Sequence, residues 1–257
     1  MSVELYDADY FSSIRGAKSG DRLFLGFLEL MRANGAESDE VLDLGCGCGQ
    51  LLELLVAETD WKISGLDFSP SAIEVARESV GEKVDLVCGS ATDRTLYPEN
   101  KFDLICMMDV VEHLQPENLR MSLANARYWL KPGGRLLIHT FPTLTLHNIY
   151  RQFLRWTGKK KALDELDQIH CNVQTRAKLS AILASVDLSC DKMWLQNDFT
   201  LTSSTFQKLP AGRIKSLLGF FLDRVLGSSL LRELFSRLGI LELASPSIYA
   251  LASKSDR

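Results

Sequence analysis

Three glycines and an aspartate have a spacing that suits binding of a ligand with a sugar. Gly45, Gly47 and Gly49 alternate between two apolar segments, and Asp67 ends the next apolar segment. Glycine lets the backbone turn sharply and approach a ligand closely because it has no Cβ. A helix that follows such a loop offers unpaired N–H groups to a carboxylate or phosphate. Asp67 could accept hydrogen bonds from both hydroxyls of a ribose, so the spacing predicts a site for an adenosine-bearing cofactor.

A second aspartate, Asp43, discriminates between two such cofactors. Dinucleotide sites follow the pattern G-x-G-x-x-G with an acid about 20 residues further on, whereas this chain has G-x-G-x-G. Asp67 fits both patterns. Asp43, two residues before the first glycine, would be unfavourable beside a pyrophosphate and favourable near an ammonium group. It therefore favours S-adenosylmethionine, which carries an amine and a positive sulfur, over a nicotinamide dinucleotide.

Four stretches resemble, in the expected order, the class I S-adenosylmethionine-dependent methyltransferases of the type 11/12 group. They are residues 43–49, 66–70, 102–114 and 130–138. Together they cover residues 38–140 well and the remainder of the chain loosely. The resemblance implies S-adenosylmethionine as cofactor and methyl transfer as the reaction.

Apolar segments and helical patterns alternate along the chain, which favours a parallel sheet covered on both faces. We therefore expect an α/β fold, a three-layer, Rossmann-like, doubly wound sheet of about seven strands, with the last strand antiparallel as the resemblance implies. The predicted strands are 41–44, 62–67, 83–87, 102–108, 135–140, 188–195 and 247–253, and the predicted helices are 23–32, 50–58, 71–79, 116–130 and 175–185.

We expect a single methyltransferase domain with four parts. Residues 1–37 would form a helical cap, residues 38–140 the cofactor-binding core, and residues 141–171 and 197–246 acceptor-side insertions that act as a lid. In 146–161, apolar side chains recur at helical spacing on one face and basic side chains on another. Residues 213–240 are rich in Leu and Phe. Either segment could contact a membrane surface. The alternative for 146–161 is a lid helix with a solvated face. The alternative for 213–240 is a set of helices packed on the sheet or on a partner chain.

The resemblance also assigns roles to individual residues. The glycines and Asp43 would hold the methionine part, Asp67 the ribose, and Phe68 one face of the adenine. Ser90 stands where the family often has an aspartate that contacts the adenine amine. The expected cofactor-binding residues are Asp43, Gly45, Cys46, Gly47, Gly49, Asp67, Phe68, Ser90, Ala91, Met108 and Asp109.

Two histidines are candidates for a catalytic base, because histidine can accept a proton near neutral pH. His113 follows the predicted strand 102–108, beside the expected methyl donor, and its alternative role is to shape that loop. His170 lies in a loop that would face the acceptor, and its alternative role is to start the next helix. No histidine has metal-ligand spacing to another, so no metal is predicted.

Composition limits the partners and the compartment. A net charge of −4 argues against nucleic acid as a partner. Six scattered cysteines suit free thiols in a reducing compartment. Residues 1–10 do not resemble a signal peptide, and no apolar run approaches the ~18 residues of a membrane span, so a cytoplasmic protein is expected. The oligomeric state is not predicted.

The first functional hypothesis is methyl transfer to an oxygen, with nitrogen or carbon as alternatives, of a small-molecule, sugar or lipid-linked acceptor. A second is a non-catalytic protein of the same fold that binds S-adenosylmethionine and a partner. A third is an NAD-dependent oxidoreductase, which the glycine spacing and Asp43 disfavour.

Overall fold

The structure is a computed structural model that describes residues 22–34, 40–196 and 247–254 of the 257-residue chain. Most of the predicted cap 1–37, the insertion 197–246 and the candidate membrane segment 213–240 lie outside the described residues.

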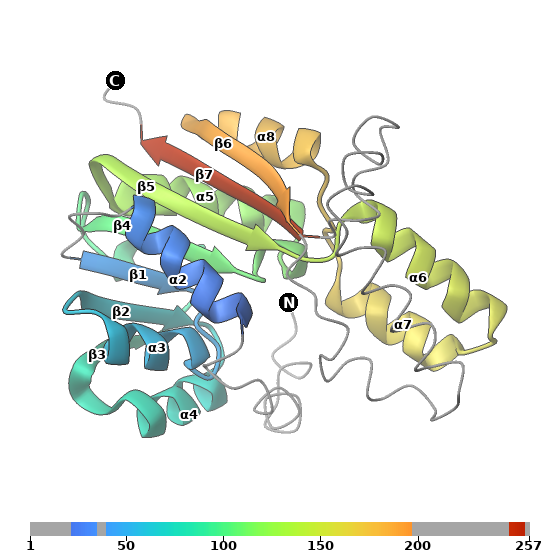
Figure 1. Ribbon diagram of the computed structural model, residues 1–257, viewed down its shortest axis with the longest axis horizontal. Helices are drawn as coiled ribbons and strands as arrows, with labels where there is room; N and C mark the ends of the chain where they lie inside the picture. Colours follow the sequence, from blue (N-terminus) through green and yellow to red (C-terminus); the bar gives the residue numbers. More distant parts are fainter. Residues whose placement is uncertain (1–21, 35–39, 197–246, 255–257) are drawn as a thin grey trace.

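The centre of the molecule is one seven-stranded sheet of order β3-β2-β1-β4-β5-β7-β6 (Figure 1). Neighbouring strands from β3 to β5 are parallel, and β7 is antiparallel to both β5 and β6. The strands are β1 Glu40–Leu44, β2 Lys62–Asp67, β3 Val84–Cys88, β4 Phe102–Met108, β5 Leu130–Thr140, β6 Leu188–Gln196 and β7 Ser247–Lys254. The expected Rossmann-like α/β sheet with an antiparallel last strand is confirmed.

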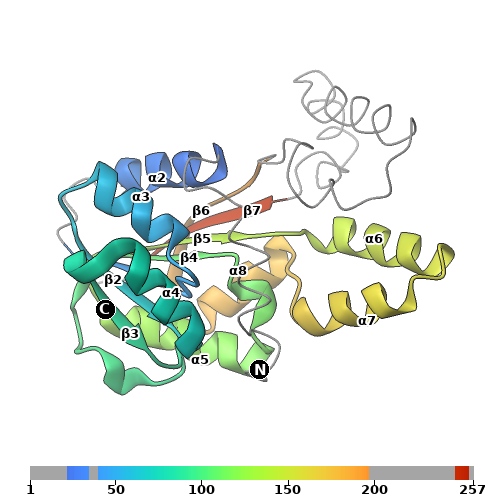
Figure 2. The same cartoon turned by 90° about the horizontal axis from the view of Figure 1, so that it is seen from below.

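Helices cover both faces of the sheet, and α2, α3, α4, α5 and α8 bury apolar side chains against it. The helices are α2 Arg22–Asn34, α3 Gln50–Glu58, α4 Pro70–Val80, α5 Pro116–Trp129, α6 Leu144–Trp156, α7 Lys160–Ile169 and α8 Arg176–Ala184, with short 3-10 turns η2 Gly81–Lys83, η3 Arg94–Leu96 and η4 Val111–His113. Helices α2, α3 and α4 share one core cluster or border it, and α5 and α8 share the other. Figure 2 shows the two sets on opposite sides of the sheet, with α6 and α7 projecting beyond it as a hairpin.

The hairpin differs from the sequence expectation of one basic amphipathic helix over 146–161. Helix α6 ends at Trp156, and α7 begins four residues later at Lys160. Gly158 between them has a φ of 69°, a left-handed conformation that a glycine adopts readily and that ends a helix. Lys160 and Lys161 therefore begin a second helix instead of extending the first.

Trp129 is the largest fully buried side chain of the core and closes the end of α5 against the sheet. Its indole Nε1–H donates to the carbonyl oxygen of Arg94 at 3.0 Å. The ring of Tyr97 meets the Trp129 ring edge-on, with 5.4 Å between centroids. Edge-to-face pairs of this kind add stability beyond the apolar area that they bury.

Replacing Trp129 with Phe should lower the free energy of unfolding by about 2–3 kcal/mol, because the change removes core volume and leaves the Arg94 carbonyl without its donor. Urea denaturation followed by circular dichroism measures this. Tyr97→Phe is the matched control: no described residue pairs with the buried Tyr97 hydroxyl, so its removal should cost less than about 1 kcal/mol. Equal losses in the two variants would contradict the assigned role of the indole N–H.

Candidate functional site

A cavity of about 460 Å³ opens at the carboxyl ends of the parallel strands. Open α/β sheets bind ligands at this edge because the strand order reverses there and the connecting loops separate. The lining residues come from the loops after β1, β2, β3 and β4 and from α5. They are Leu44, Gly45, Gly47, Cys48, Gln50, Leu66, Asp67, Phe68, Gly89, Ser90, Ala91, Thr92, Asp109, Val110, His113, Leu114, Asn118 and Ser122.

The glycine loop after β1 forms one wall of this cavity. Gly45, Gly47 and Gly49 have φ values of 85°, 52° and 86°, the left-handed region that favours glycine. The N–H of Gly45 donates to the carbonyl of Leu66 at 2.7 Å, which fixes the loop to the end of β2. A Cβ on Gly45 would overlap the side chain of Val110. The loop is therefore closely packed against the segment that follows β4.

Asp67 joins the glycine loop to the start of α4. One carboxylate oxygen accepts from the Gly47 N–H at 3.0 Å and the other from the Ser69 N–H at 2.9 Å. Burial raises the pKa of Asp67, and the backbone hydrogen bonds from Ser69 and Gly47 oppose that rise. Each oxygen retains a lone pair, and the side chain lines the cavity. Asp67 can therefore order the loop and still accept hydrogen bonds from a ligand.

Asp43 lies beneath the loop and does not line the cavity. Its side chain is 3% exposed, and its Oδ1 lies 3.6 Å from Sγ of Cys106 on β4. Burial raises the pKa of Asp43 to about 7. Three other predicted residues, Cys46, Gly49 and Met108, are also outside the lining. Cys46 is buried in the core between the loop and α3.

The far end of the cavity is formed by Phe68, Ser90 and Ala91, as expected, together with α5. The Ser90 hydroxyl accepts from the Thr92 N–H at 3.2 Å, so it caps its own turn. Sequence reasoning missed Ser122 of α5, whose buried hydroxyl lines the cavity and pairs with no described residue. Little in the sequence indicated this role, because a serine on the buried side of a helix is common.

Asp109 stands between the cavity and the end of β5. Its φ is 54°, and its carboxylate oxygen lies 2.9 Å from Nδ1 of His139. The backbone N–H of Asp109 also donates to the carbonyl of His139 at 3.0 Å. His139 is 1% exposed, so this pair fixes Asp109 at the cavity wall from inside the core.

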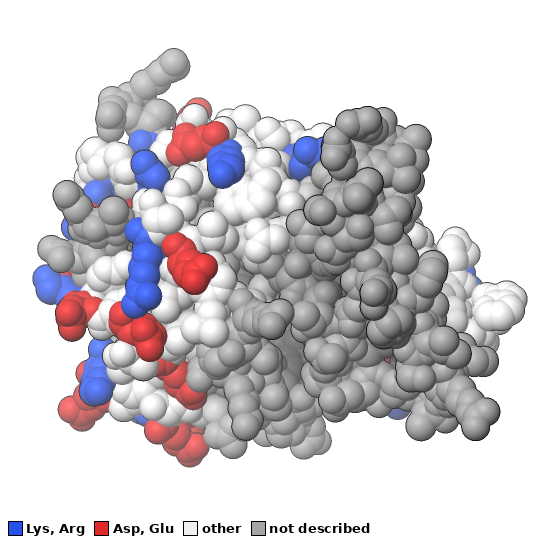
Figure 3. Space-filling view, in the orientation of Figure 1, with Lys and Arg blue, Asp and Glu red and all other residues white. Residues whose placement is uncertain are grey.

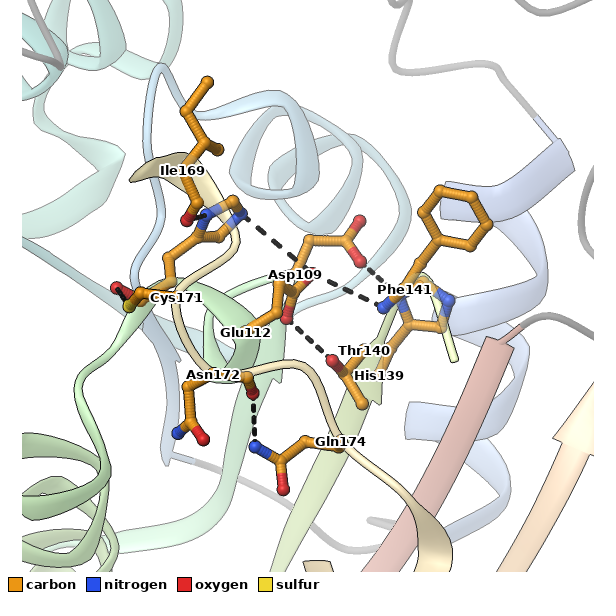
Figure 4. A network of polar contacts seen from close by, with 10 residues as sticks. Asp109, Glu112, His139, Thr140, Phe141, Ile169, Cys171, Asn172 and Gln174 are labelled. Atoms are coloured by element: carbon orange, nitrogen blue, oxygen red, sulfur yellow. Dashed lines mark hydrogen bonds and ion pairs between the residues drawn. The ribbon is translucent and has the colours of Figure 1, made fainter. Parts of the chain in front are cut away.

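Glu112 is a second residue that sequence reasoning missed, and it lies at the centre of the polar network in Figure 4. Its carboxylate accepts from the Thr140 hydroxyl at 2.7 Å and from the Phe141 N–H at 3.4 Å. Its backbone carbonyl accepts from the Asn172 N–H at 3.0 Å. Burial and the nearby charge of Asp109 raise the pKa of Glu112 to about 8. The network thus connects η4 with β5 and with the linker between α7 and α8.

His113 lines the cavity, and its hydrogen bonding defines the position of its proton. Nδ1 lies 2.9 Å from the backbone carbonyl of Ile169. A carbonyl can only accept, so Nδ1 carries the hydrogen and Nε2 of the neutral ring has a lone pair. Burial lowers the pKa of His113 below 6.5. The ring is therefore neutral at pH 7, with Nε2 4.0 Å from Glu112.

His170 lies next to the His113 ring but outside the cavity lining. The centroids of the two rings are 5.2 Å apart, and those of His170 and His147 are 5.9 Å apart. Burial and the two neighbouring histidines lower the pKa of His170 to about 4. Its neutral ring therefore supports the side of His113 that faces the α6–α7 hairpin.

Over the described ranges, no group of three or more His, Cys, Asp or Glu side chains could hold a metal ion. The six cysteines are free thiols. Among the described helices, none has the length and apolar composition needed to cross a membrane.

Residues 41–134 match the family model described as a methyltransferase domain. The chain is 32% identical over 121 residues to the ubiquinone biosynthesis O-methyltransferase of Idiomarina loihiensis, covering 45% of this chain and 47% of the relative. It is 27% identical over 158 residues to the phosphoethanolamine N-methyltransferase of Plasmodium falciparum, covering 61% and 57%. The matched regions thus span about half the length of these curated relatives.

A solved structure of a SAM-dependent methyltransferase from Archaeoglobus fulgidus has the same fold, with a TM-score of 0.60, 19% identity and coverage of 90% of this chain and 93% of that one. The sheet order, the glycine loop at its carboxyl edge and the family match lead to one assignment. Residues 41–134 match a methyltransferase domain, and the fold around them is the one found in methyltransferases that use S-adenosylmethionine as cofactor.

Proposed function

We propose that this protein transfers a methyl group from S-adenosylmethionine to an oxygen of a small-molecule, sugar or lipid-linked acceptor. The observation that carries the proposal is His113, whose lone pair at Nε2 is fixed beside the cavity that the glycine loop and Asp67 share. Hydroxyl acceptors need a proton removed as they react, and a neutral histidine can remove it.

The residues of the cavity fit the cofactor. The carboxylate of Asp67 would accept from the ribose hydroxyls, and Phe68 would pack on the adenine. Ser90 and Ala91 would border the adenine, where the buried hydroxyl of Ser122 offers a further hydrogen bond. The loop Gly45–Gly49 and Asp109 would border the methionine part. When bound, the cofactor supplies a methyl group activated by a positively charged sulfur.

Asp43 has a supporting role in this proposal. Its carboxyl lies under the loop next to Cys106 instead of in the cavity. The positive charge of a nearby ammonium would favour the ionised form of a carboxyl whose pKa burial has raised. Asp43 would therefore attract the amine electrostatically, without direct contact, from the other side of the loop. Cys46, Gly49 and Met108 would support the loop and the end of β4 from outside the cavity.

The protein's part in the reaction is to position the acceptor, exclude water and accept a proton. An in-line displacement depends mainly on alignment of the two reactants. His113 would take the proton of the acceptor hydroxyl at Nε2, which lies 4.0 Å from the carboxyl of Glu112. The raised pKa of Glu112, about 8, keeps most of that carboxyl protonated at neutral pH, so it becomes a charged partner of the imidazolium only at higher pH. His170 would act through the ring of His113, which it contacts. The relative from Idiomarina loihiensis is an O-methyltransferase, in agreement with an oxygen acceptor, and the relative from Plasmodium falciparum is an N-methyltransferase, which favours a nitrogen acceptor.

Asp67→Ala should weaken binding of S-adenosylmethionine by about 100-fold or more, because the change removes a charged acceptor for two ribose hydroxyls and the partner of the Gly47 N–H. Titration calorimetry measures this with S-adenosylmethionine, S-adenosylhomocysteine and NADH as ligands. Asp85→Asn, at an exposed acid on β3, is the matched control and should change affinity less than about twofold. Binding of NADH alone to the unmodified protein would overturn the cofactor assignment.

His113→Gln should lower kcat by about 100-fold or more and leave the Kd of S-adenosylmethionine within about threefold. In the unmodified enzyme kcat should fall as the pH drops below 6.5, since protonation of Nε2 removes the lone pair and the pKa of His113 lies below that value. The variant should lack this acid limb. His170→Gln should cost less, because its ring is outside the cavity. These profiles are measured with an acceptor found by screening with a labelled methyl donor, and an unchanged acid limb in His113→Gln would exclude His113 as the base.

A further inference from the structure

We propose that the free end of the α6–α7 hairpin, residues 149–161, binds the surface of an anionic lipid bilayer. This hairpin tip projects past the carboxyl edge of the sheet, the edge at which the cavity opens (Figures 1 and 2). The proposal rests on the composition and exposure of the tip and does not depend on methyl transfer.

One side of α6 carries large apolar side chains without a described partner surface. Ile149, Tyr150, Phe153 and Trp156 are 50%, 42%, 40% and 85% exposed. Their spacing places them on one side of the helix, because residues three, four and seven apart share a face. Leu154, by contrast, is 2% exposed. Helix α6 therefore packs through one face and presents a second, apolar face outward.

Basic side chains follow this apolar face in the sequence, at the end of the hairpin. Arg155, Lys159, Lys160 and Lys161 lie within seven residues, and the next acid in the sequence is Asp164. Within the described ranges, no carboxylate forms an ion pair with the first three of these four. The whole chain has a net charge of −4, so the tip is a local positive region. In the view of Figure 3, acidic and basic side chains are interspersed at the opposite end of the molecule.

The combination of side chains favours a lipid surface over a protein partner. Trp and Tyr place an apolar ring in the acyl region and a polar atom at the headgroups, and long basic side chains reach anionic headgroups from beside them. Each Lys or Arg near an anionic surface contributes roughly a fivefold gain in partitioning. A protein-binding patch would instead be depleted in lysine at its centre, whereas three consecutive lysines, Lys159 to Lys161, follow Trp156 within five residues in this hairpin.

Polar contacts join the two helices of the hairpin to each other and to the residues around the cavity. Arg151 of α6 and Asp167 of α7 form an ion pair at 2.7 Å, which joins the two helices. At the base, the Leu144 N–H donates to the carbonyl of Gln174 at 3.1 Å, and the carbonyl of Ile169 accepts from His113. A tip bound to a bilayer would thus place the cavity near the lipid headgroups, where amphiphilic molecules are concentrated.

The test is co-sedimentation of the full chain with phosphatidylcholine vesicles, with and without phosphatidylglycerol. We expect binding only with phosphatidylglycerol. Lys159→Gln with Lys160→Gln should lower the partition coefficient about 25-fold, and Trp156→Ala about tenfold or more. The matched control is Lys62→Gln with Lys83→Gln, which removes the same charge from exposed sites at the amino ends of β2 and β3 and should change binding less than twofold.

A second readout locates the contact. Tryptophan emission should shift to the blue when the protein binds vesicles, and the shift should disappear in Trp156→Ala while the far-ultraviolet circular dichroism is unchanged. Equal binding to both vesicle types, or equal binding of the lysine variant and its control, would overturn the proposal. So would concentration-dependent dimerisation that Trp156→Ala abolishes in a protein that does not bind vesicles, because the apolar face would then contact a second copy of the chain.

Discussion

The buried carboxyl of Glu112 is the constraint on which the acceptor side of this structure depends. It accepts hydrogen bonds from two consecutive residues at the end of β5, Thr140 and Phe141, while the backbone of the same residue accepts from the linker before α8. A buried carboxyl without such donors would be costly, so the three segments are held together by the need to satisfy it. His113 is the next residue along the chain, and its orientation is a direct result of that packing. His113, the proposed base, and the hairpin are consequently fixed by one polar network rather than by separate contacts.

On the cofactor side of the cavity, backbone N–H groups rather than side chains donate the hydrogen bonds that hold the structure together. Asp67 accepts from the N–H groups of Gly47 and Ser69, so the loop and the start of α4 are organised around one carboxylate. Left-handed glycines make that geometry possible, and the contact of Gly45 with Val110 ties the loop to the segment that leads to Glu112. The glycine loop and the segment after β4 are thus in van der Waals contact at Gly45, where there is no room for a Cβ.

Sequence reasoning predicted the sheet and part of the cavity lining, because these depend on local patterns: apolar runs, alternating glycines and an acid at a strand end. The antiparallel last strand followed from the family resemblance. It could not separate Asp43 from the residues that line the cavity, since a spacing does not say on which side of a loop a side chain lies. Glu112 escaped notice because its partners at β5 and at the α7–α8 linker are distant in sequence. The break at Gly158 was missed because the basic residues on both sides keep a helical spacing across it.

The pairing of β6 with β7 has a consequence for how the family could diversify. Gln196, the last residue of β6, lies in register opposite Ser247, the first residue of β7. The two ends of the segment 197–246 are therefore held side by side by the ladder itself, at the rim that also carries the start of the hairpin. Closing a long connection between fixed points costs free energy that grows only slowly with its length. Evolution could therefore exchange or lengthen that connection without disturbing the register of β6 on β7 or of any other pair of strands.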